Sequence, residues 1–202
     1  TTEQYGIADL ITQTANLLLP IISVGITDGV FRFAIDSKID RKSVFSSGVY
    51  TITLGGLAFA LIVPILWITH QFDGYIWLIV LYTMFSCYHS LCSKYIRACG
   101  STAFFAIQGI VNTSLVIVLN ILFLAVFNFG VTGYVLSVAI ADLLSTLLIV
   151  VRDKLWRDVT FKVDKTVLKE MLRYSIPMIP ATIFWWVTSV SNRYFVNGFF
   201  GA

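Results

Sequence analysis

Six apolar runs, each long enough to cross a bilayer, fill nearly the whole chain. A helix needs roughly 20 residues, at about 1.5 Å each, to cross about 30 Å of hydrocarbon. The runs cover Ile7–Phe33, Ser46–Ile68, Tyr75–Leu91, Ala103–Phe127, Val131–Val151 and Ile176–Phe200. The alternation typical of barrel strands is absent, so the sequence predicts an all-α, polytopic membrane bundle of six transmembrane helices.

The composition agrees with a membrane protein. The chain is 57% apolar and 12% charged, whereas a soluble domain is roughly 45–50% apolar and about 25% charged. We expect Cys87, Cys92 and Cys99 to be buried apolar side chains, because they lack metal-ligand spacing. No phosphate loop, nucleophile elbow or acid–base carboxylate pair occurs in the sequence. We therefore expect no enzyme, no metal, no other cofactor and no nucleic-acid partner.

The positive charges fall in alternate loops. Lys and Arg follow the first, third and fifth runs, whereas the intervening loops and the first four residues have none. Because Lys and Arg prefer the cytoplasmic side, this pattern places the start of the chain outside. Such an orientation is natural for a piece of a longer protein that lacks one earlier helix. We interpret residues 1–202 as a single membrane domain.

The longest loop, residues 152–174, is predicted to be a basic cytoplasmic loop that contains a short amphipathic helix. Asp164 can cap this helix. The apolar residues on one face are Val167, Leu168, Met171 and Leu172. A membrane-surface helix beside anionic lipid is favoured over a solvated linker, without a specific ligand.

Stripes of small residues predict where helices pack closely, because helices in lipid associate through close contact rather than the hydrophobic effect. One stripe has Ser47, Thr51 and Gly55, and the other has Gly133, Ser137, Ala141 and Ser145. Prolines at 20, 64, 177 and 180 also interrupt the runs, and kinks at these positions suit a moving transporter as well as an ordinary membrane helix.

Ionisable side chains inside the runs cost roughly 2.5–3.5 kcal/mol each on insertion, so each is a candidate functional residue. Asp28 and Arg32 lie one helical turn apart and can form a pair. Asp142 lies near the middle of the fifth run, where it either binds a coupling ion, H⁺ or Na⁺, or hydrogen-bonds the fourth run. Arg193 lies deep in the sixth run, where it either faces a cavity or reaches the outer headgroups.

The fourth run carries a polar stripe of Gln108, Asn112 and Asn120. Side-chain amides in a membrane helix need hydrogen-bond partners, from water or from another helix. The stripe therefore either lines a water-filled cavity or bonds a neighbouring helix, and the sequence leaves both open.

Several stretches resemble the polysaccharide biosynthesis flippases of O-antigen and capsule repeat units, in the multidrug/oligosaccharidyl-lipid/polysaccharide exporter superfamily. The stretches are Tyr5–Leu10, Leu18–Ile22, Val30–Phe33, Tyr95–Gly100, Gly130–Ser137 and Tyr174–Pro180, followed by Asn192-Arg193-Tyr194. The resemblance implies a two-lobe, multi-pass transporter of the bacterial cytoplasmic membrane. This chain would hold helices two to seven, which are most of the N-terminal lobe and the start of the next helix.

The resemblance also implies a substrate, an undecaprenyl-pyrophosphate-linked oligosaccharide that crosses the membrane by alternating access between the lobes. Embedded arginines of the family's cavity, which bind the pyrophosphate, are matched here by Arg32 and Arg193. Where relatives often have Asp before the second arginine, this chain has Asn192, which leaves Arg193 without an adjacent counter-charge. Further substrate-binding candidates are Arg97, Asn112 and Gln108, and the ion-coupling candidates are Asp142 and Asp28. Membrane lipids are the other expected partners.

The alternative function is a multidrug or cation antiporter of the same superfamily. An organic cation needs carboxylates in the cavity, and the only carboxylate near the middle of the membrane is Asp142. Deep arginines favour an anionic substrate instead. The sequence therefore favours the flippase.

Overall fold

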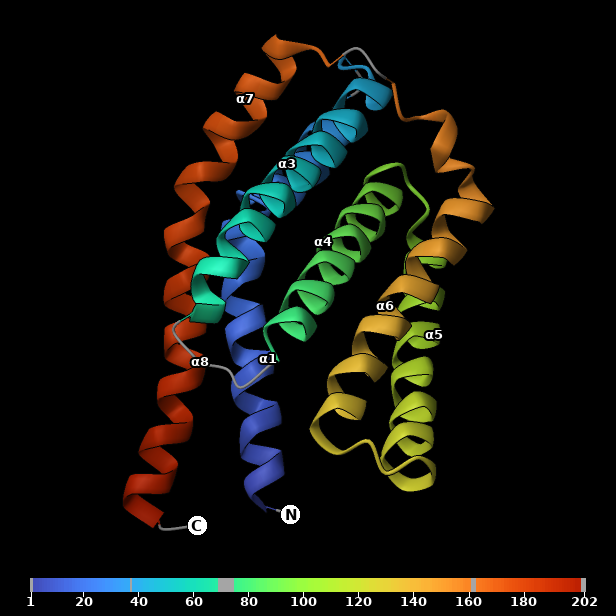
Figure 1. Ribbon diagram of the computed structural model, residues 1–202. Coiled ribbons are helices and arrows are strands. Elements are labelled where there is room, and N and C mark those ends of the chain that lie inside the picture. Colours follow the sequence, from blue (N-terminus) through green and yellow to red (C-terminus); the bar gives the residue numbers. More distant parts are fainter. Residues whose placement is uncertain (1, 37, 69–74, 161–162, 201–202) are drawn as a thin grey trace.

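The computed structural model describes residues 2–36, 38–68, 75–160 and 163–200, and its side chains within 6–36, 38–63, 75–160 and 163–191. Every regular element in these ranges is helical, with no strand among them. The chain is an all-α bundle, as predicted (Figure 1).

The long helices are α1 (Thr2–Ile22), α3 (Arg41–Ile68), α4 (Ile76–Ala98), α5 (Thr102–Asn120), α6 (Gly130–Asp153) and α8 (Ile179–Phe200). The short elements are α2 (Ile26–Ile35), α7 (Lys165–Ser175), the π-helical turn η1 (Ile121–Val126) and the 3₁₀ turns η2 (Leu155–Arg157) and η3 (Ile176–Met178). Helix α4 is central, because it contacts α1, α2, α3, α5 and α6.

Four helices in the described part of the chain are long and apolar enough to cross a membrane, namely α3, α4, α5 with η1, and α6. The bent pair of α1 and α2 makes a fifth if it counts as one span. The sixth predicted run, Ile176–Phe200, comprises the 3₁₀ turn η3 and helix α8, and its side chains are described only as far as residue 191. The protein is a polytopic membrane protein, whereas six spans and a second lobe stay predictions.

The first predicted span is wrong as a single helix, because α1 and α2 meet at a bend of 53°. The N–H of Gly25 bonds the Pro20 carbonyl, five residues back, as in a Schellman motif. Val24 and Gly25 have φ angles of 52° and 62°, in the left-handed region that ends a helix. Helix α2 then starts in a new direction, although hydropathy alone indicates one continuous run here.

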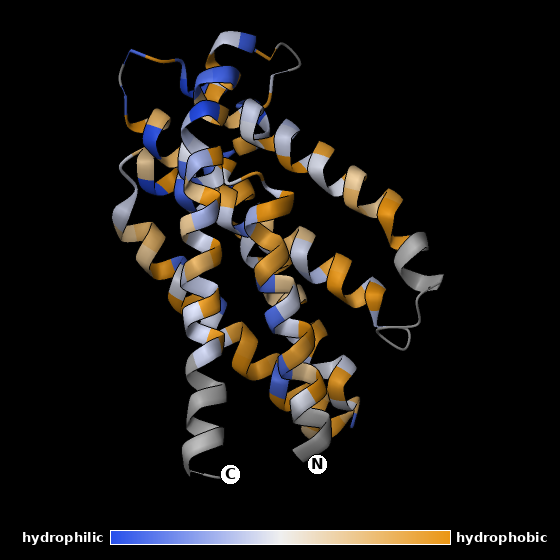
Figure 2. Ribbon diagram, turned by 90° about the vertical axis from the view of Figure 1, so that its left-hand side faces the viewer, coloured by the Kyte–Doolittle hydropathy of each residue, from blue (hydrophilic) through white to orange (hydrophobic). Residues whose placement is uncertain are grey.

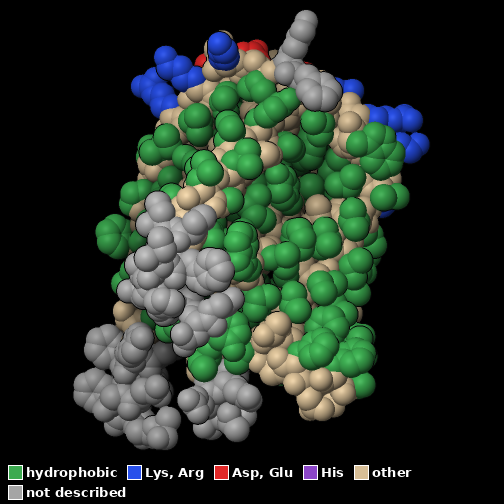
Figure 3. All heavy atoms as spheres, in the orientation of Figure 1, with side chains coloured by type: hydrophobic (Ala, Val, Ile, Leu, Met, Phe, Trp, Pro, Cys, Tyr) green, Lys and Arg blue, Asp and Glu red, His purple; other side chains and the backbone are tan. Residues whose placement is uncertain are grey.

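The basic residues gather at one end of the bundle (Figure 3), where hydrophilic residues also concentrate (Figure 2). Lys42 Nζ lies 3.7 Å from Asp158 Oδ1. Ser46 Oγ lies 3.1 Å from both the Asp158 carbonyl oxygen and Thr160 Oγ1. The loops after the first and fifth predicted spans therefore meet at one end, as alternating charge predicts, and the cytoplasmic assignment of that end stays a prediction.

Helix α7 confirms the predicted amphipathic helix and its cap, but it packs on protein. Asp164 accepts hydrogen bonds from the N–H groups of Thr166 and Val167. Met171 is fully buried in a cluster with residues of α2 and α3, and α7 contacts both helices. The membrane-surface interpretation is therefore wrong for the Met171 face, which the bundle covers.

We expect Asp164→Ala to lower the free energy of unfolding by about 1 kcal/mol, because two N–H groups of the first turn lose their acceptor. Chemical denaturation of the purified protein in detergent measures the change. The matched control is Lys165→Ala, one residue further on, whose side chain is exposed. Equal unfolding midpoints for the two variants would contradict the capping role.

Both stripes of small residues lie at helix contacts, as predicted. Ser137 and Ala141 are fully buried in α6, which contacts α4 and α5. A Cβ on Gly55 of α3 would lie 2.0 Å from the carbonyl oxygen of Ile22. Helix α3 therefore touches the backbone of α1 directly beside the break.

Candidate functional site

The break between α1 and α2 opens on a cavity of about 190 Å³. Helices α1, α2 and α4 and the start of α8 form its wall. The polar residues that line it include Asn16, Ser23, Asp28, Ser90, Lys94 and Thr182. A helix break in a membrane protein persists only where protein or water satisfies its backbone groups. The polar cavity beside this break can hold such water or a ligand, so it is a candidate binding site.

An ion pair between α2 and α4 lies in this cavity. Lys94 Nζ lies 2.6 Å from Asp28 Oδ1 and 3.0 Å from Thr27 Oγ1. The side chains of Lys94 and Asp28 are 33% and 39% exposed, so the pair faces the cavity rather than a sealed core. Lys94 follows the third predicted run, Tyr75–Leu91, but it lies within a helix because α4 continues to Ala98.

The predicted pair of Asp28 and Arg32 does not form, because Asp28 bonds Lys94 instead. The Arg32 guanidinium lies over the Tyr174 ring, 4.7 Å from its centroid. A guanidinium held by its face against a ring can still bind oxyanions with its N–H edge. Arg32 is exposed, so it remains a candidate for a phosphate group.

Arg97 is held in the same way at the end of α4. Its guanidinium carbon lies 5.2 Å from the centroid of the Phe31 ring and 5.1 Å from that of Phe105. Two rings on different helices fix the direction of this exposed side chain. Arg97 therefore presents a positioned cation beside α2 and α5.

A second polar cluster surrounds Asp142, which is only 6% exposed in the middle of α6. Ser86 of α4 donates a hydrogen bond to its Oδ2. Asn112 of α5 donates to its Oδ1 over 3.1 Å, and His89 Nδ1 of α4 lies 3.4 Å from the same oxygen. Three side chains from two neighbouring helices therefore converge on one buried carboxylate.

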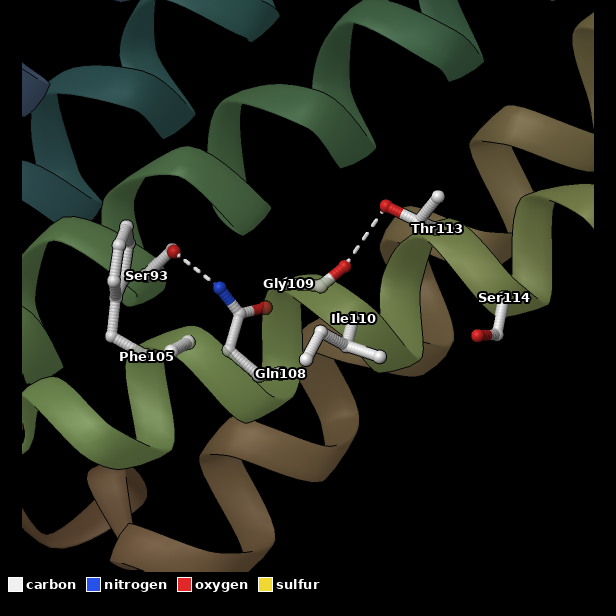
Figure 4. Close-up of a pocket in the computed structure, with 8 residues that line it drawn as sticks. Ser93, Phe105, Gln108, Gly109, Ile110, Thr113 and Ser114 are labelled. Carbon is white, nitrogen blue, oxygen red and sulfur yellow. Dashed lines mark hydrogen bonds between the residues drawn. The ribbon is translucent and has the colours of Figure 1, made fainter.

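The cluster continues from His89 to the surface of the bundle. His89 Nε2 lies 3.0 Å from Gln108 Oε1, and Gln108 Nε2 donates to Ser93 Oγ over 2.7 Å. Gln108 and Ser93 line a groove of about 580 Å³ between α4 and α5, together with Gly109 and Thr113 (Figure 4). A continuous polar chain thus joins the Asp142 carboxylate to an open groove.

The predicted polar stripe of α5 bonds other helices at all three positions. Asn112 bonds Asp142, and its own Oδ1 accepts from Ser145 Oγ over 2.9 Å. Asn120 Oδ1 accepts from Ser137 Oγ over 2.8 Å. Gln108 bonds α4 and also lines the groove. The stripe is therefore a helix contact, and the role of Asp142 in ion coupling stays a prediction.

The Arg193 side chain lies outside the described residues, so its predicted role is not decided. Two residues nearer the start of α8, one helical turn apart, are described. Thr182 lines the smaller cavity, and Trp186 Nε1 donates to the Gln13 carbonyl over 3.0 Å. This face of α8 lies against α1 over the described part of the helix.

His89 and Lys94 belong to the two clusters but are not among the site residues that the sequence predicts. Three polar residues of α4, Ser86, His89 and Ser93, recur at spacings of three and four, which places them on one helix face. That spacing is a sequence signal for a polar face on this helix. Lys94 had no comparable signal, because its partner lies in another helix.

The prediction that the cysteines are buried apolar side chains is confirmed at two of the three, whereas Cys99 is only partly buried. Cys87 and Cys92 lie inside the bundle, as predicted. Burial raises the pKa of the Cys99 thiol, just after α4, which keeps it protonated at neutral pH. No group of His, Cys, Asp and Glu able to hold a metal ion occurs within the described ranges.

No family model, curated protein or solved structure matches the chain. The fold and the two polar clusters define a polytopic helical membrane protein with charged groups inside its bundle. The function is therefore argued from the geometry of these clusters.

Proposed function

We propose that the chain is most of one lobe of a flippase in the bacterial cytoplasmic membrane. The substrate would be an undecaprenyl-pyrophosphate-linked oligosaccharide, which moves between leaflets by alternating access during polysaccharide biosynthesis. The observation that carries the proposal is Lys94, a cation on a membrane helix that faces a cavity at a helix break.

Broken helices support a transport role, because transporters commonly build their substrate sites from discontinuous membrane helices. The break lies between α1 and α2, next to the close contact between Gly55 and Ile22. Two elements joined at a bend can change their relative angle more easily than one continuous helix. The cavity therefore lies where a change of access would alter its shape.

The placement of cations supports an anionic substrate. Lys94 lies in the cavity, and Arg32 and Arg97 are exposed and held against aromatic rings on α7, α2 and α5. Arginine suits phosphate oxygens because its planar fork donates two parallel hydrogen bonds. A pyrophosphate at the basic end would meet these arginines first and Lys94 within the cavity.

The alternative, an antiporter of organic cations, is favoured by the carboxylates Asp28 and Asp142. Asp28 is neutralised by Lys94 at 2.6 Å. Asp142 is buried and accepts hydrogen bonds from Ser86 and Asn112, and His89 Nδ1 lies 3.4 Å from its Oδ1. Neither carboxylate offers a cationic ligand an open, unpaired negative charge. The exposed guanidinium groups of Arg32 and Arg97, in contrast, lie against aromatic rings and keep their N–H edges for an anion, so the flippase is preferred.

Reconstitution of the full-length protein in proteoliposomes distinguishes the flippase from the antiporter. We expect a fluorescent undecaprenyl-pyrophosphate-linked glycan to become accessible to an external quencher faster than in protein-free vesicles. We expect no efflux of an organic cation dye from the same preparation. Dye efflux without movement of the glycan would replace the flippase by the antiporter.

A further inference from the structure

The groove between α4 and α5 follows one face of α5. Its wall is made of residues within Phe105–Ser114, together with Ser93 of α4. Ala106, Gly109 and Thr113 recur at spacings of three and four, so small side chains share this face of the helix. A Cβ on Gly109 would meet nothing within 4 Å, so the groove is hollow at this residue. Its volume of about 580 Å³ lies within the range of about 300–1,000 Å³ typical of ligand sites.

The polar groups of the groove wall bond other groups of the protein. Gln108 Nε2 donates to Ser93 Oγ over 2.7 Å, and Thr113 Oγ1 donates to the Gly109 carbonyl over 3.0 Å (Figure 4). Gln108 Oε1 lies 3.0 Å from His89 Nε2. Because these groups have partners inside the protein, a hydrocarbon chain in the groove would leave none of them unpaired.

The groove opens on an apolar surface. Ile107, Ile110 and Ile117 of α5 are each more than half exposed, and α5 with η1 is long and apolar enough to cross a membrane. The wall from Phe105 to Ser114 extends about 13 Å along the helix, at about 1.5 Å per residue. The hydrocarbon of one leaflet is about 15 Å deep, half of about 30 Å. The groove therefore matches one acyl chain in length and in polarity.

Arg97 lies at the end of the groove that is nearest the basic residues. The Tyr95 hydroxyl donates to Asp158 Oδ2 over 3.2 Å, which places this end of α4 at the basic end of the bundle. Arg97 is one helical turn beyond Ser93, so both lie on one face of α4. Its guanidinium carbon lies 5.1 Å from the centroid of the Phe105 ring, which lines the groove. A guanidinium stacked in this way keeps its N–H edge for an oxyanion.

A second guanidinium is held at the start of α5. The guanidinium carbon of Arg152, at the end of α6, lies 3.6 Å from the centroid of the Phe104 ring. Both Arg97 and Arg152 are exposed. Within the described ranges neither of them forms an ion pair with a carboxylate, since the three ion pairs there use other cations. The described part of the chain therefore leaves two positive charges beside the groove without a counter-charge.

We propose that the groove between α4 and α5 binds one acidic glycerophospholipid from the leaflet at the basic end. One acyl chain lies along the wall from Phe105 to Ser114, and the phosphate accepts hydrogen bonds from Arg97. Basic pockets between membrane helices are typical sites for acidic head groups. A head group without an ammonium is preferred, because Arg97 and Arg152 attract a net negative charge and repel an added cation.

This lipid site is separate from the cavity at the helix break, because the two share no lining residue. It does not rest on the proposed function, since it requires only a bilayer that contains acidic phospholipid. A substrate pyrophosphate that reaches Arg97 would first displace the phospholipid head group.

Photo-crosslinking of the full-length protein in vesicles of equal phosphatidylglycerol and phosphatidylcholine content tests the site. One protein carries a photoreactive benzoylphenylalanine in place of Ile110, which lines the groove, and the control carries it in place of Ile107, which is exposed outside the groove. At Ile110 we expect phosphatidylglycerol adducts to exceed phosphatidylcholine adducts about fivefold, the factor for one cation beside an anionic lipid. At Ile107 we expect similar yields of both. Equal selectivity at the two positions would indicate unspecific lipid and overturn the proposal.

Two substitutions in the protein with the Ile110 probe test the two parts of the site. Arg97→Gln removes the cation, so we expect the selectivity for phosphatidylglycerol to be lost. Arg157→Gln is the control, because Arg157 is exposed at the same end and contacts no ring within the described part of the chain. Gly109→Leu fills the groove, so we expect fewer adducts of both lipids. Unchanged selectivity in Arg97→Gln, or unchanged yields in Gly109→Leu, would overturn the proposal.

Vesicles that contain undecaprenyl pyrophosphate in place of phosphatidylglycerol distinguish the two sources of a lipid phosphate. Adducts of undecaprenyl pyrophosphate at Ile110, without any adducts of phosphatidylglycerol in the first experiment, would assign the groove to the proposed substrate and overturn the phospholipid site. Selective phosphatidylglycerol adducts in a protein that moves no lipid-linked glycan would support the lipid site and refute only the proposed function.

Discussion

Among Gly→Ala substitutions at the described glycines, Gly55→Ala is expected to lower the free energy of unfolding the most. The new Cβ would lie 2.0 Å from the carbonyl oxygen of Ile22, which is the last residue of α1. The obstacle is backbone, so it cannot rotate away as a side chain would. Overpacking ordinarily costs about 1–3 kcal/mol, and we expect at least about 3 kcal/mol here because two helices must separate.

The control for Gly55→Ala is Gly109→Ala in α5, where nothing lies within 4 Å of the new Cβ. Alanine is favoured over glycine in a helix by roughly 0.5–1 kcal/mol, so this control should be neutral or stabilising. Denaturation of both variants in the same detergent measures the difference. Two variants of equal stability would mean that α3 does not pack on the end of α1 as described.

The helices were predictable because lipid leaves the backbone few choices. Each N–H and C=O in hydrocarbon must bond within its own segment, so long apolar runs become helices. The small-residue stripe from Gly133 to Ser145 was predictable for a similar reason, since close packing replaces the hydrophobic effect between helices. Pro20 predicts an interruption of the first run, but it lies inside α1. The position of the break, at Val24 and Gly25, was not predictable, because both residues are compatible with a continuous apolar run.

Which polar side chains bond one another was harder to predict than which positions carry polar side chains. Spacing along a helix reveals only neighbours one turn away, so it predicts Arg32 as the partner of Asp28. Its partner Lys94 is 66 residues further on, in a helix that only the packing of α2 on α4 brings near. His89 and Asp142 likewise lie close together only because α4 packs on α6. Local rules identify candidate groups, and tertiary packing decides their pairs.

Lys94→Met is expected to reduce movement of the lipid-linked glycan at least about tenfold. A hydrogen bond to a charged group contributes about 1.5–3 kcal/mol, and every 1.4 kcal/mol corresponds to about a factor of ten. Methionine keeps the length and the apolar stem of the side chain but has no cation for a phosphate oxygen. The flipping assay with the fluorescent glycan measures the loss, and Lys169→Met, on the exposed face of α7, serves as the control.

A loss of transport in Lys94→Met has a second explanation, since the Asp28 carboxylate would lose the partner 2.6 Å away. We expect that change to lower the free energy of unfolding by about 1–3 kcal/mol, because an ionised acceptor is left unpaired in the bundle. The double variant Asp28→Asn, Lys94→Met removes both charges, so it should recover most of this stability.

Transport separates the two explanations. If Lys94 serves only to neutralise Asp28, the double variant should flip the glycan as fast as wild type. If Lys94 binds the anionic group, the double variant should be as stable as wild type but still move the glycan at least about tenfold more slowly. If the double variant recovers both stability and transport, Lys94 has only a structural role as the partner of Asp28. The observation on which the flippase proposal rests would then be lost.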